Sequence, residues 1–362
     1  MNYELFKSIK TMKKQLVLFV SILLCVSSCA TAKNSESKEN NGNNGNTPYL
    51  TREFPASSIK EVEATTSGGS LMLTGDAVSK AVVEVYVSRD NWSNEKIKQV
   101  LDDNYTLDIK VVDGKLYAVA KQKKNINNWD SKGLSISFKI SVPKQVNSNM
   151  QTSGGGIQIS NLSGSQDFKT SGGSLMVDNV SGSITGATSG GGISVTNSKD
   201  NIDLKTSGGS IIANGCSGTI NLATSGGGIS LNNLTGKIDA VTSGGSIMAN
   251  NISGTLTTAT SGGSVSLEAI SGNLEAKTSG GNMIVKIKSA NEYVRLSNSG
   301  NLNLVLPAGK NYNLSVKANK IDVSGLQNFS GSQDNSRLEG TIGSGGTEVT
   351  VKSSQWVWLS FE

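Results

Sequence analysis

The sequence of 362 residues contains no histidine, only four prolines and three cysteines, and aromatic residues make up 5% of it. Histidine is the side chain that most often serves as a general base in enzymes, and it is the commonest metal ligand. Its absence argues against most catalytic and metal-binding functions. Aromatic residues are also missing from one long stretch, because no Phe, Tyr or Trp occurs between Lys169 and Glu292.

The first 28 residues are predicted to be a signal peptide. Two lysines precede an uncharged stretch at residues 16–26, which is too short to span a bilayer as a mature helix. Small residues then lead to Cys29, as in a bacterial lipoprotein signal, where the cysteine becomes the acylated N-terminus. This resemblance implies a membrane anchor at Cys29 and a place in the cell envelope, at the outer membrane, on its periplasmic or surface face. Simple secretion with cleavage nearby is the alternative, and Met12 is an alternative start.

Residues 29–50 are predicted to hold the anchored cysteine and a flexible linker, because residues 30–47 are polar and low in complexity. Cleavage before Cys29 leaves 29 basic and 27 acidic residues, a net charge of +2. Nothing in this charge favours nucleic acid. Of the cysteines only Cys216 then remains besides Cys29, so a disulfide framework is excluded.

Residues 51–150 are predicted to form irregular strands and one short helix. The strand segments are recognised by alternation or by β-branched residues, and they lie at 70–73, 81–87, 105–112, 116–120 and 134–142. A helix is expected at 94–101 with Ser93 as its N-cap, and Asp113-Gly114 is expected to form a hairpin turn.

From residue 152 the chain repeats the phrase Thr-Ser-Gly-Gly, followed by Gly or Ser and an aliphatic residue. Successive copies keep one constant spacing and begin at Thr152, Thr170, Thr188, Thr206, Thr224, Thr242, Thr260 and Thr278, which gives an 18-residue period. A degenerate copy follows at 297–301, and an early copy lies at 66–70. A fixed period of this kind indicates a repeat architecture.

With the threonine as position 1, aliphatic residues recur at positions 6, 8, 11 and 15, a spacing that indicates strands. One repeat thus holds two short strands and two corners, which together make one coil of a β-solenoid, each coil pairing with the next. The sequence therefore predicts an all-β protein, a parallel β-helix with 18-residue coils. Irregular coils with a short helix should precede the regular array at 151–306, and an aromatic-rich cap should follow it at 307–362.

The glycines of both corners are expected to adopt positive φ. The threonines at position 1 and the asparagines at position 10 are expected to form ladders from coil to coil. Cys216 occupies an aliphatic position and is expected to be a buried small hydrophobe. Position 5 alternates between Gly and Ser over 156–246, which suggests an ancestral 36-residue duplication.

These motifs resemble a bacterial family of repeat-rich β-solenoids, the DUF4097 type, whose members carry the name "putative adhesin"; related head-GIN proteins share the Gly/Ser-rich coil. The resemblance lies in Leu134–Pro143, in residues 152–164 and in the repeated Thr-Ser-Gly-Gly units, and it spans roughly residues 55–360. It implies a β-helical cell-envelope protein and brings no catalytic motif.

No catalytic, cofactor or metal site is predicted. The densest charged cluster of the array surrounds Asp200 and Asp203, and a solvated corner explains it. Trp92 and Trp129 lie in polar loops and are the candidate ligand contacts, although packing of a cap is the simpler reading.

Three functions follow from these observations. The first is a non-enzymatic, lipid-anchored adhesin or surface scaffold that binds a glycan or a matrix protein. The second is an enzyme acting on envelope glycans, which requires a pair of carboxylates on the folded coil. The third is a regulatory sensor of the envelope.

Overall fold

The computed structural model describes residues 38–39, 47–123 and 133–362. The chain divides into the units Met1–Glu36 and Ser37–Glu362, and all described residues belong to the second. Cys29 and Trp129 lie outside the described residues. In the described part, no helix is both long and apolar enough to cross a membrane.

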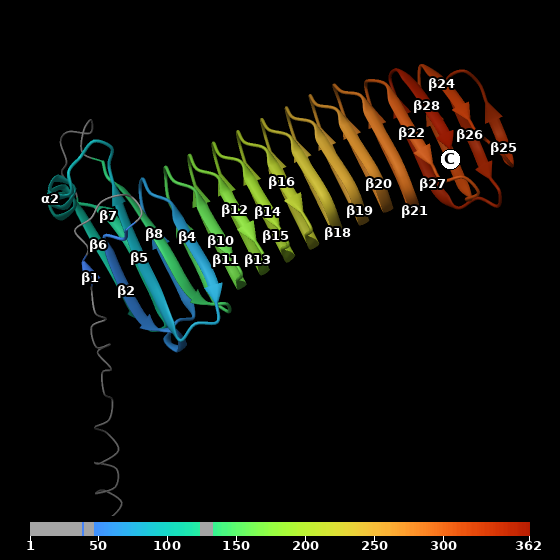
Figure 1. Cartoon of the computed structure of the whole chain (residues 1–362). Helices are drawn as coiled ribbons and strands as arrows, with labels where there is room; N and C mark the ends of the chain where they lie inside the picture. The colour runs from blue at the N-terminus through green and yellow to red at the C-terminus, as the bar shows by residue number, and fades with distance from the viewer. Residues whose placement is uncertain (1–37, 40–46, 124–132) are drawn as a thin grey trace, which may run out of the picture. The chain divides into compact units, whose positions relative to one another are not determined.

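The elements before the regular array are mostly strands (Figure 1). They are β1 (Lys38–Glu39), β2 (Leu50–Pro55), η1 (Ala56–Ser58), β3 (Glu61–Thr65), β4 (Leu71–Asp76), β5 (Lys80–Ser88), α2 (Asn94–Asn104), β6 (Tyr105–Val112), β7 (Lys115–Gln122), β8 (Ser135–Pro143) and β9 (Asn147–Gln151).

The regular array contains β10 (Ile157–Ser160), β11 (Ser163–Thr170), β12 (Leu175–Asp178), β13 (Ser181–Thr188), β14 (Ile193–Thr196), β15 (Lys199–Thr206), β16 (Ile211–Asn214), β17 (Ser217–Thr224), β18 (Ile229–Thr242), β19 (Ile247–Thr260), β20 (Val265–Thr278) and β21 (Met283–Asn298). The C-terminal strands are β22 (Leu302–Leu306), β23 (Tyr312–Lys317), β24 (Lys320–Ser324), β25 (Phe329–Gln333), β26 (Arg337–Ile342), β27 (Thr347–Ser353) and β28 (Trp356–Phe361).

Each coil of the array consists of a four-residue strand followed by an eight-residue strand. Equivalent residues of successive coils pair in parallel, for example Ile157 with Leu175 and Ser163 with Ser181. In β18, β19 and β20 the two strands run together into one of 14 residues. The predicted β-solenoid with 18-residue coils is confirmed.

The coils at the N-terminal end do not stack in sequence order. The coil of β3 and β4 carries the early Thr66 copy, and it pairs with β9 and β10. Its other side pairs with β7 and β8, which come later in the chain. The hairpins and the helix of residues 77–146 are thus inserted between two coils that are neighbours in space.

The C-terminal end is interleaved in the same way. Strands β27 and β28 pair with β21 and β22 on one side and with β23 and β24 on the other. Antiparallel strands then close both ends of the stack: β25 and β26 at this end, and β1, β2 and β5 at the other. Such closure limits the pairing of one stack with the edge of another.

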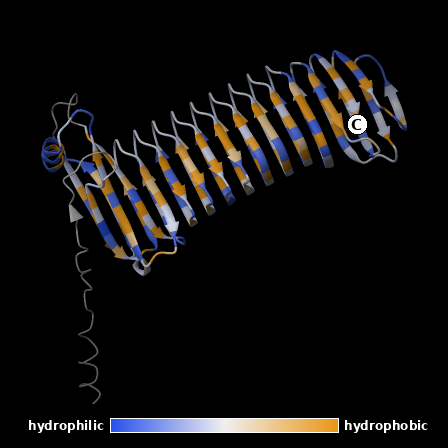
Figure 2. Cartoon of the chain, in the orientation of Figure 1, coloured by the Kyte–Doolittle hydropathy of each residue, from blue (hydrophilic) through white to orange (hydrophobic). Residues whose placement is uncertain are grey.

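The core fills the inside of every coil because side chains alternate between the two faces of each strand. Side chains at positions 6, 8 and 15 of the coils at Thr188 and Thr224, for example Ile193 and Leu231, are at most 2% exposed. Figure 2 shows the resulting bands of hydrophobic residues repeating from strand to strand. Cys216 is buried in this core, as predicted.

The local elements expected before the array are confirmed. The side chain of Ser93 accepts a hydrogen bond from the amide of Lys96 (3.3 Å) at the start of α2. Asp113 and Gly114 have φ values of 50° and 82° in the hairpin between β6 and β7, as a type I′ turn requires.

The explanation given for the Ser-Gly-Gly corner is wrong. Its glycines lie outside the left-handed region; in the array that region is occupied by the glycines at position 13, for example Gly236 (φ 125°), and by Gly215 at position 10 (φ 64°). The second corner glycine is needed for another reason: a Cβ on Gly227 would lie 2.1 Å from the carbonyl oxygen of Gly209 in the preceding coil. The residues with positive φ that the prediction missed are the position-10 asparagines, whose φ is 50–57°.

The threonine ladder differs from expectation in how it bonds, and the asparagine ladder forms only in part. The Thr170 hydroxyl donates to the carbonyl oxygen of Gly155 in the preceding coil (2.8 Å) and accepts from the amide of Gly173 (3.3 Å). The same pair of bonds recurs in each later coil to Thr278, so the threonines bond to glycine backbone and not to one another. The position-10 asparagines bond to one another in two places, from Asn179 to Asn161 (2.7 Å) and from Asn251 to Asn233 (2.8 Å), and Gly215 interrupts the row between them.

Candidate functional site

A shallow groove runs along the Thr-Ser corners of five stacked coils. Its volume is about 650 Å³, and it is lined by the residues at positions 18, 1 and 2 of each coil. The lining residues are Thr65, Thr66, Ser67, Gln151, Thr152, Ser153, Lys169, Thr170, Ser171, Ala187, Thr188, Ser189, Lys205, Thr206 and Ser207. We call it the Thr-Ser groove.

The polar groups of the Thr-Ser groove are of two kinds. The position-1 threonine hydroxyls are buried and donate to backbone carbonyls, that of Ile136 for Thr66 and those of glycines in the other four coils, so they hold the corner. The serine side chains are exposed, and in the described structure none of the five hydroxyls bonds to the protein. Coils stack about 4.8 Å apart, so the groove presents a row of free hydroxyls at that spacing.

Charge enters the groove only through Lys169 and Lys205, which lie two coils apart. Lys205 is paired with Asp203 at 3.1 Å. No carboxylate lines the groove, and two carboxylates are what glycoside hydrolysis needs. The arrangement suits hydrogen bonding to an extended, hydroxyl-rich ligand, and it offers no acid and base for its cleavage.

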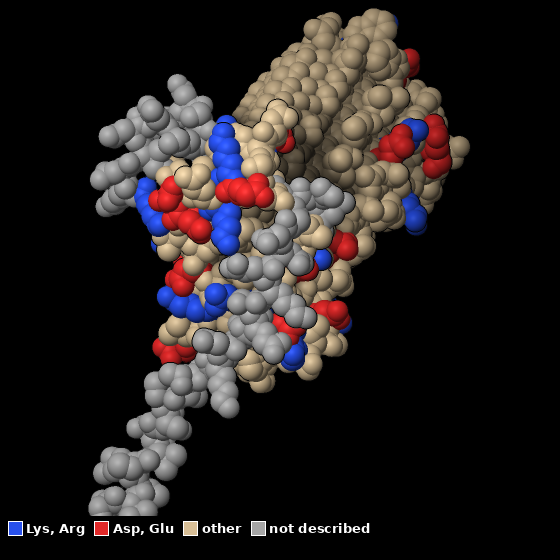
Figure 3. Space-filling view, turned by 60° about the vertical axis from the view of Figure 1, so that its left-hand side comes forward, with Lys and Arg blue, Asp and Glu red and all other residues tan. Residues whose placement is uncertain are grey.

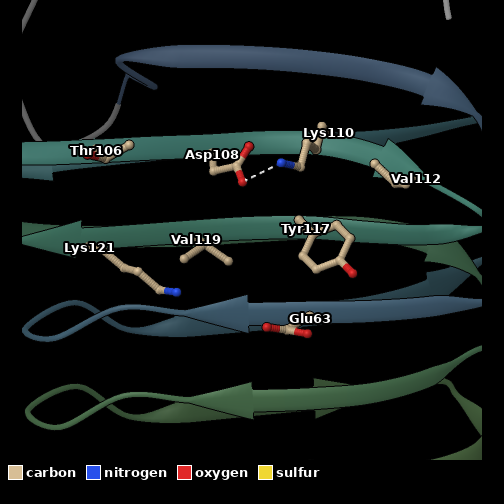
Figure 4. Close-up of a pocket in the computed structure, with 8 residues that line it drawn as sticks. All are labelled: Glu63, Thr106, Asp108, Lys110, Val112, Tyr117, Val119 and Lys121. Atoms are coloured by element: carbon tan, nitrogen blue, oxygen red, sulfur yellow. Dashed lines mark ion pairs between the residues drawn. The ribbon is translucent and has the colours of Figure 1, made fainter. Parts of the chain in front are cut away.

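A second concave surface lies on the outer side of β3, β6 and β7 (Figure 4). Its volume is about 460 Å³, and Tyr117 lies at its centre between charged side chains of the neighbouring strands. Asp108 pairs with Lys110 at 2.8 Å, and Lys115 pairs with Glu63 at 2.7 Å and with Glu61 at 3.0 Å. Hydrogen bonds to Glu63 and Glu61 raise the pKa of the Lys115 ammonium.

The carboxylates beside Tyr117 are not placed as a catalytic acid would be. A general acid needs its carboxyl in apolar surroundings that keep it protonated, whereas Glu63 and Asp108 are partly exposed and bonded to lysine. The surface was missed from the sequence. The alternation of Thr106, Asp108 and Lys110 along β6 was the available signal.

Charged side chains gather over the N-terminal strands, whereas the ridged surface of stacked coils in the same view is largely uncharged (Figure 3). Within residues 38–39, 47–123 and 133–362, no three His, Cys, Asp or Glu side chains are grouped to hold a metal ion. Asp200 takes the place of the position-13 corner glycine and has a φ of 82° itself. Its carboxylate accepts a hydrogen bond from the amide of Gly182 (3.0 Å), which agrees with its expected role in a solvated corner.

Of the two predicted contact residues, only Trp92 is described. It is half-buried against the core, and two cations flank its ring: the Arg89 guanidinium at 5.0 Å and the Lys96 ammonium at 4.3 Å from the centroid. Cations in these positions stabilise the loop through the ring. A role for Trp92 and Trp129 in ligand binding stays a prediction.

Comparison with known families identifies one part of the chain. Residues 255–355, which hold the end of the array and most of the C-terminal strands, match the family described as "Toastrack DUF4097". This segment is a DUF4097 domain. The DUF4097 match confirms the resemblance read from the repeats, and it is shorter than the span of 55–360 expected from them.

Known proteins add little to the DUF4097 match. Among curated protein sequences, none matches this chain. A solved "putative cell adhesion protein" from Clostridium sporogenes is 10% identical over 90% of this chain and all of its own, with a TM-score of 0.22. A "putative adhesin" from Bacteroides fragilis is 15% identical over 70% of this chain and 94% of its own, with a TM-score of 0.21. Likenesses at these scores carry no argument about fold or function.

Proposed function

We propose that this protein is a non-enzymatic lipoprotein of the cell envelope that binds an extended, hydroxyl-rich polymer, such as a glycan, as an adhesin or surface scaffold. The Thr-Ser groove is the observation that carries the proposal. It offers unbonded serine hydroxyls on consecutive coils, a lysine on two of them, and no carboxylate.

The chemistry of the groove favours binding over cleavage. A chain of sugar units presents hydroxyl groups at regular intervals, and a row of serines at fixed spacing can bond to several units at once. Each bond contributes about 0.5–1.5 kcal/mol, so affinity accumulates along the row. The DUF4097 domain and the lipoprotein-type signal that ends at Cys29 agree with a protein held at an envelope.

The groove is tested by measuring glycan binding of the wild-type protein and of the variant Ser153→Ala/Ser171→Ala/Ser189→Ala. Loss of three bonds should weaken binding by roughly 10- to 2000-fold. Ser183→Ala, an exposed serine on β13 outside the groove, is the matched control and should bind as the wild type does. Equal affinity of the triple variant and the wild type would exclude the groove as the binding site.

The anchor is tested separately by replacing Cys29 with alanine. The wild-type protein should fractionate with membranes, and the Cys29→Ala protein should be released from them. An unchanged distribution contradicts the anchor and leaves the groove untouched. Replacing both Trp92 and Trp129 with alanine shows whether the N-terminal loops contribute to adhesion.

A further inference from the structure

A row of exposed side chains follows position 7 across the outer face of the short strands, and we call it the position-7 row. Large apolar and polar residues alternate along it from coil to coil. In stacking order it runs Lys139, Met72, Gln158, Met176, Ser194, Ile212, Ser230, Met248, Ser266, Ile284, Asn303, Trp358 and Asp322.

Apart from Met72, which is half-buried, the apolar members of the position-7 row are unusually exposed for their type. Met176 and Met248 expose 52% and 57% of their surface, Ile212 and Ile284 expose 49% and 42%, and Trp358 exposes 39%. The core does not require large side chains at these positions, because the alternate coils carry Ser or Gln there. Exposed apolar residues that recur in one line indicate an interaction surface.

The sequence of the row is symmetric about Ser230. Reading outward from it, Ile212 matches Met248, Ser194 matches Ser266, and Met176 matches Ile284. The next pairs are Gln158 with Asn303, Met72 with Trp358, and Lys139 with Asp322. Apolar residues match apolar ones, amides match amides, and the terminal pair has opposite charges.

The neighbouring row at position 9 follows this symmetry only in part. Asp178 and Lys286 each lie three coils from Asn232, which occupies position 9 in the same coil as Ser230. Two coils from Asn232, however, Thr196 lies on one side and Glu268 on the other. The face is therefore uncharged from Thr196 to Asn250, with Asp178 on one side and the Glu268–Lys286 pair on the other.

We propose that the position-7 row is the interface of a two-fold symmetric dimer in which a second copy lies face to face and antiparallel. A two-fold axis through Ser230 brings residue i against residue j and residue j against residue i, as an isologous interface requires. It places Ile212 against Met248 of the second copy, Met176 against Ile284, and Asp178 against Lys286.

Charge complementarity selects the antiparallel arrangement. In a parallel pair, Lys139 would oppose a second Lys139 and Asp322 a second Asp322, and like charges brought together disfavour association. Lys139 already pairs with Glu84 at 2.9 Å, and Lys286 lies 3.7 Å from Glu268. Both lysines thus have an acidic partner within their own copy, so the charges favour the antiparallel direction by less than unpaired charges would, and the apolar residues supply the affinity.

The area of the face is sufficient for a stable pair. The row has thirteen members, so at about 4.8 Å per coil it is roughly 58 Å long, and positions 5 to 9 span about 13 Å. Each copy can bury roughly 750 Å² in this way, close to the ~800 Å² per partner of a standard interface.

The antiparallel pair deepens the proposed adhesive role and, in this one respect, rests on it. The described chain starts at one end of the stack, at β1 and β2, so the two copies of an antiparallel pair start at opposite ends. With both copies anchored at Cys29, the pair can join two facing membranes.

The test uses the mature chain with Cys29 replaced by alanine and measures its mass by sedimentation equilibrium at increasing concentration. The wild-type row should give a dimer. Ile212→Glu and Met248→Lys should each raise the dimer dissociation constant by at least about 30-fold, because each places two unpaired charges at the centre of the interface. Val241→Glu, at position 18 of its coil, outside the position-7 row and 42% exposed, is the control and should not change it.

Mixing Ile212→Glu with Met248→Lys distinguishes the orientation. In the antiparallel pair the new glutamate faces the new lysine, and the unchanged Met248 faces the unchanged Ile212, so a heterodimer should form. A wild-type chain that stays monomeric at about 100 μM, a dimer that survives Ile212→Glu, or a mixture that remains monomeric overturns the proposal. Binding of the monomeric wild-type chain to lipid vesicles, lost in Ile212→Glu, overturns it in favour of a lipid surface.

Glycan binding by the monomeric Ile212→Glu chain separates this proposal from the previous one. Retained binding together with lost dimerisation shows that the groove and the row act independently. A dimer that forms while the groove binds nothing supports the row and refutes the groove.

Discussion

Replacing Gly227 with alanine should destabilise the coil stack, whereas replacing its neighbour Gly226 should not. An alanine Cβ at Gly227 would lie 2.1 Å from the carbonyl oxygen of Gly209, and contacts below 3.0 Å are not found in proteins. The two coils must therefore separate by about 0.9 Å at this corner. At Gly226 the same Cβ would lie 3.4 Å from the nearest atom, an ordinary contact.

The cost follows from the hydrogen bonds that span this corner. All three acceptors are backbone carbonyl oxygens. The amide of Gly226 donates to that of Ser207 (2.9 Å), the amide of Ile211 to that of Gly228 (3.0 Å), and the Thr224 hydroxyl to that of Gly209 (2.8 Å). Weakening three such bonds at about 1 kcal/mol each gives a loss of roughly 3 kcal/mol. Neither glycine has a positive φ, so backbone strain does not enter the comparison.

Urea denaturation followed by circular dichroism measures the difference, and amide hydrogen exchange locates it. Gly227→Ala should lower the unfolding midpoint and speed exchange at Gly226 and Ile211. Gly226→Ala is the matched control, because both substitutions change the unfolded chain by the same residue type. Midpoints that correspond to stabilities within about 0.5 kcal/mol of each other would refute the stacking explanation.

Two further predictions concern buried titratable groups. Burial raises the pKa of the Tyr312 phenol from 10.0 to about 12, so the folded state favours the neutral phenol. The contribution of Tyr312 to the free energy of unfolding is complete below pH 10 and is lost as the pH rises to about 12, a loss of up to roughly 2.7 kcal/mol. Tyr312→Phe loses the hydrogen bond to the carbonyl oxygen of Pro307 (3.0 Å). Between pH 10 and 12 its unfolding midpoint should nevertheless fall less steeply than that of the wild-type protein. An equal fall in both proteins would contradict this reasoning. Burial also raises the pKa of the Cys216 thiol, so a thiol reagent at pH 8 should label Cys216 only after addition of denaturant; rapid labelling of the folded protein would show that the core opens there.

The repeat allowed the architecture to be predicted because its period fixes both the length of a coil and the register of stacking. Position 6 is apolar in every copy, and in the structure each of these residues pairs with the next, as Ile229 does with Ile247. The short elements before the array were also predictable, because the Ser93 cap and the Asp113-Gly114 turn depend on local sequence alone.

The remaining features depend on distances between coils, which a single copy does not contain. The second corner glycine is required by the backbone of the preceding coil, so its role was mistaken for a positive φ. The early copy at Thr66 was recognised, but its place beside Thr152 was not, because the inserted hairpins and helix separate the two in sequence. Tyr117 was overlooked since its surface forms only when β3 and β6 flank β7.

The interleaved order of coils at the two ends has a consequence for how this chain can change length. Internal coils contact only the coil before and the coil after, always in the same register, so one can be gained or lost without disturbing distant contacts. Both ends are closed by segments outside the repeats, and they survive such a change intact. Removal of a single coil would place two apolar or two polar position-7 residues on adjacent coils, whereas removal of two consecutive coils keeps the alternation. Gain or loss of paired coils would thus change the distance between the two closed ends while keeping the alternation.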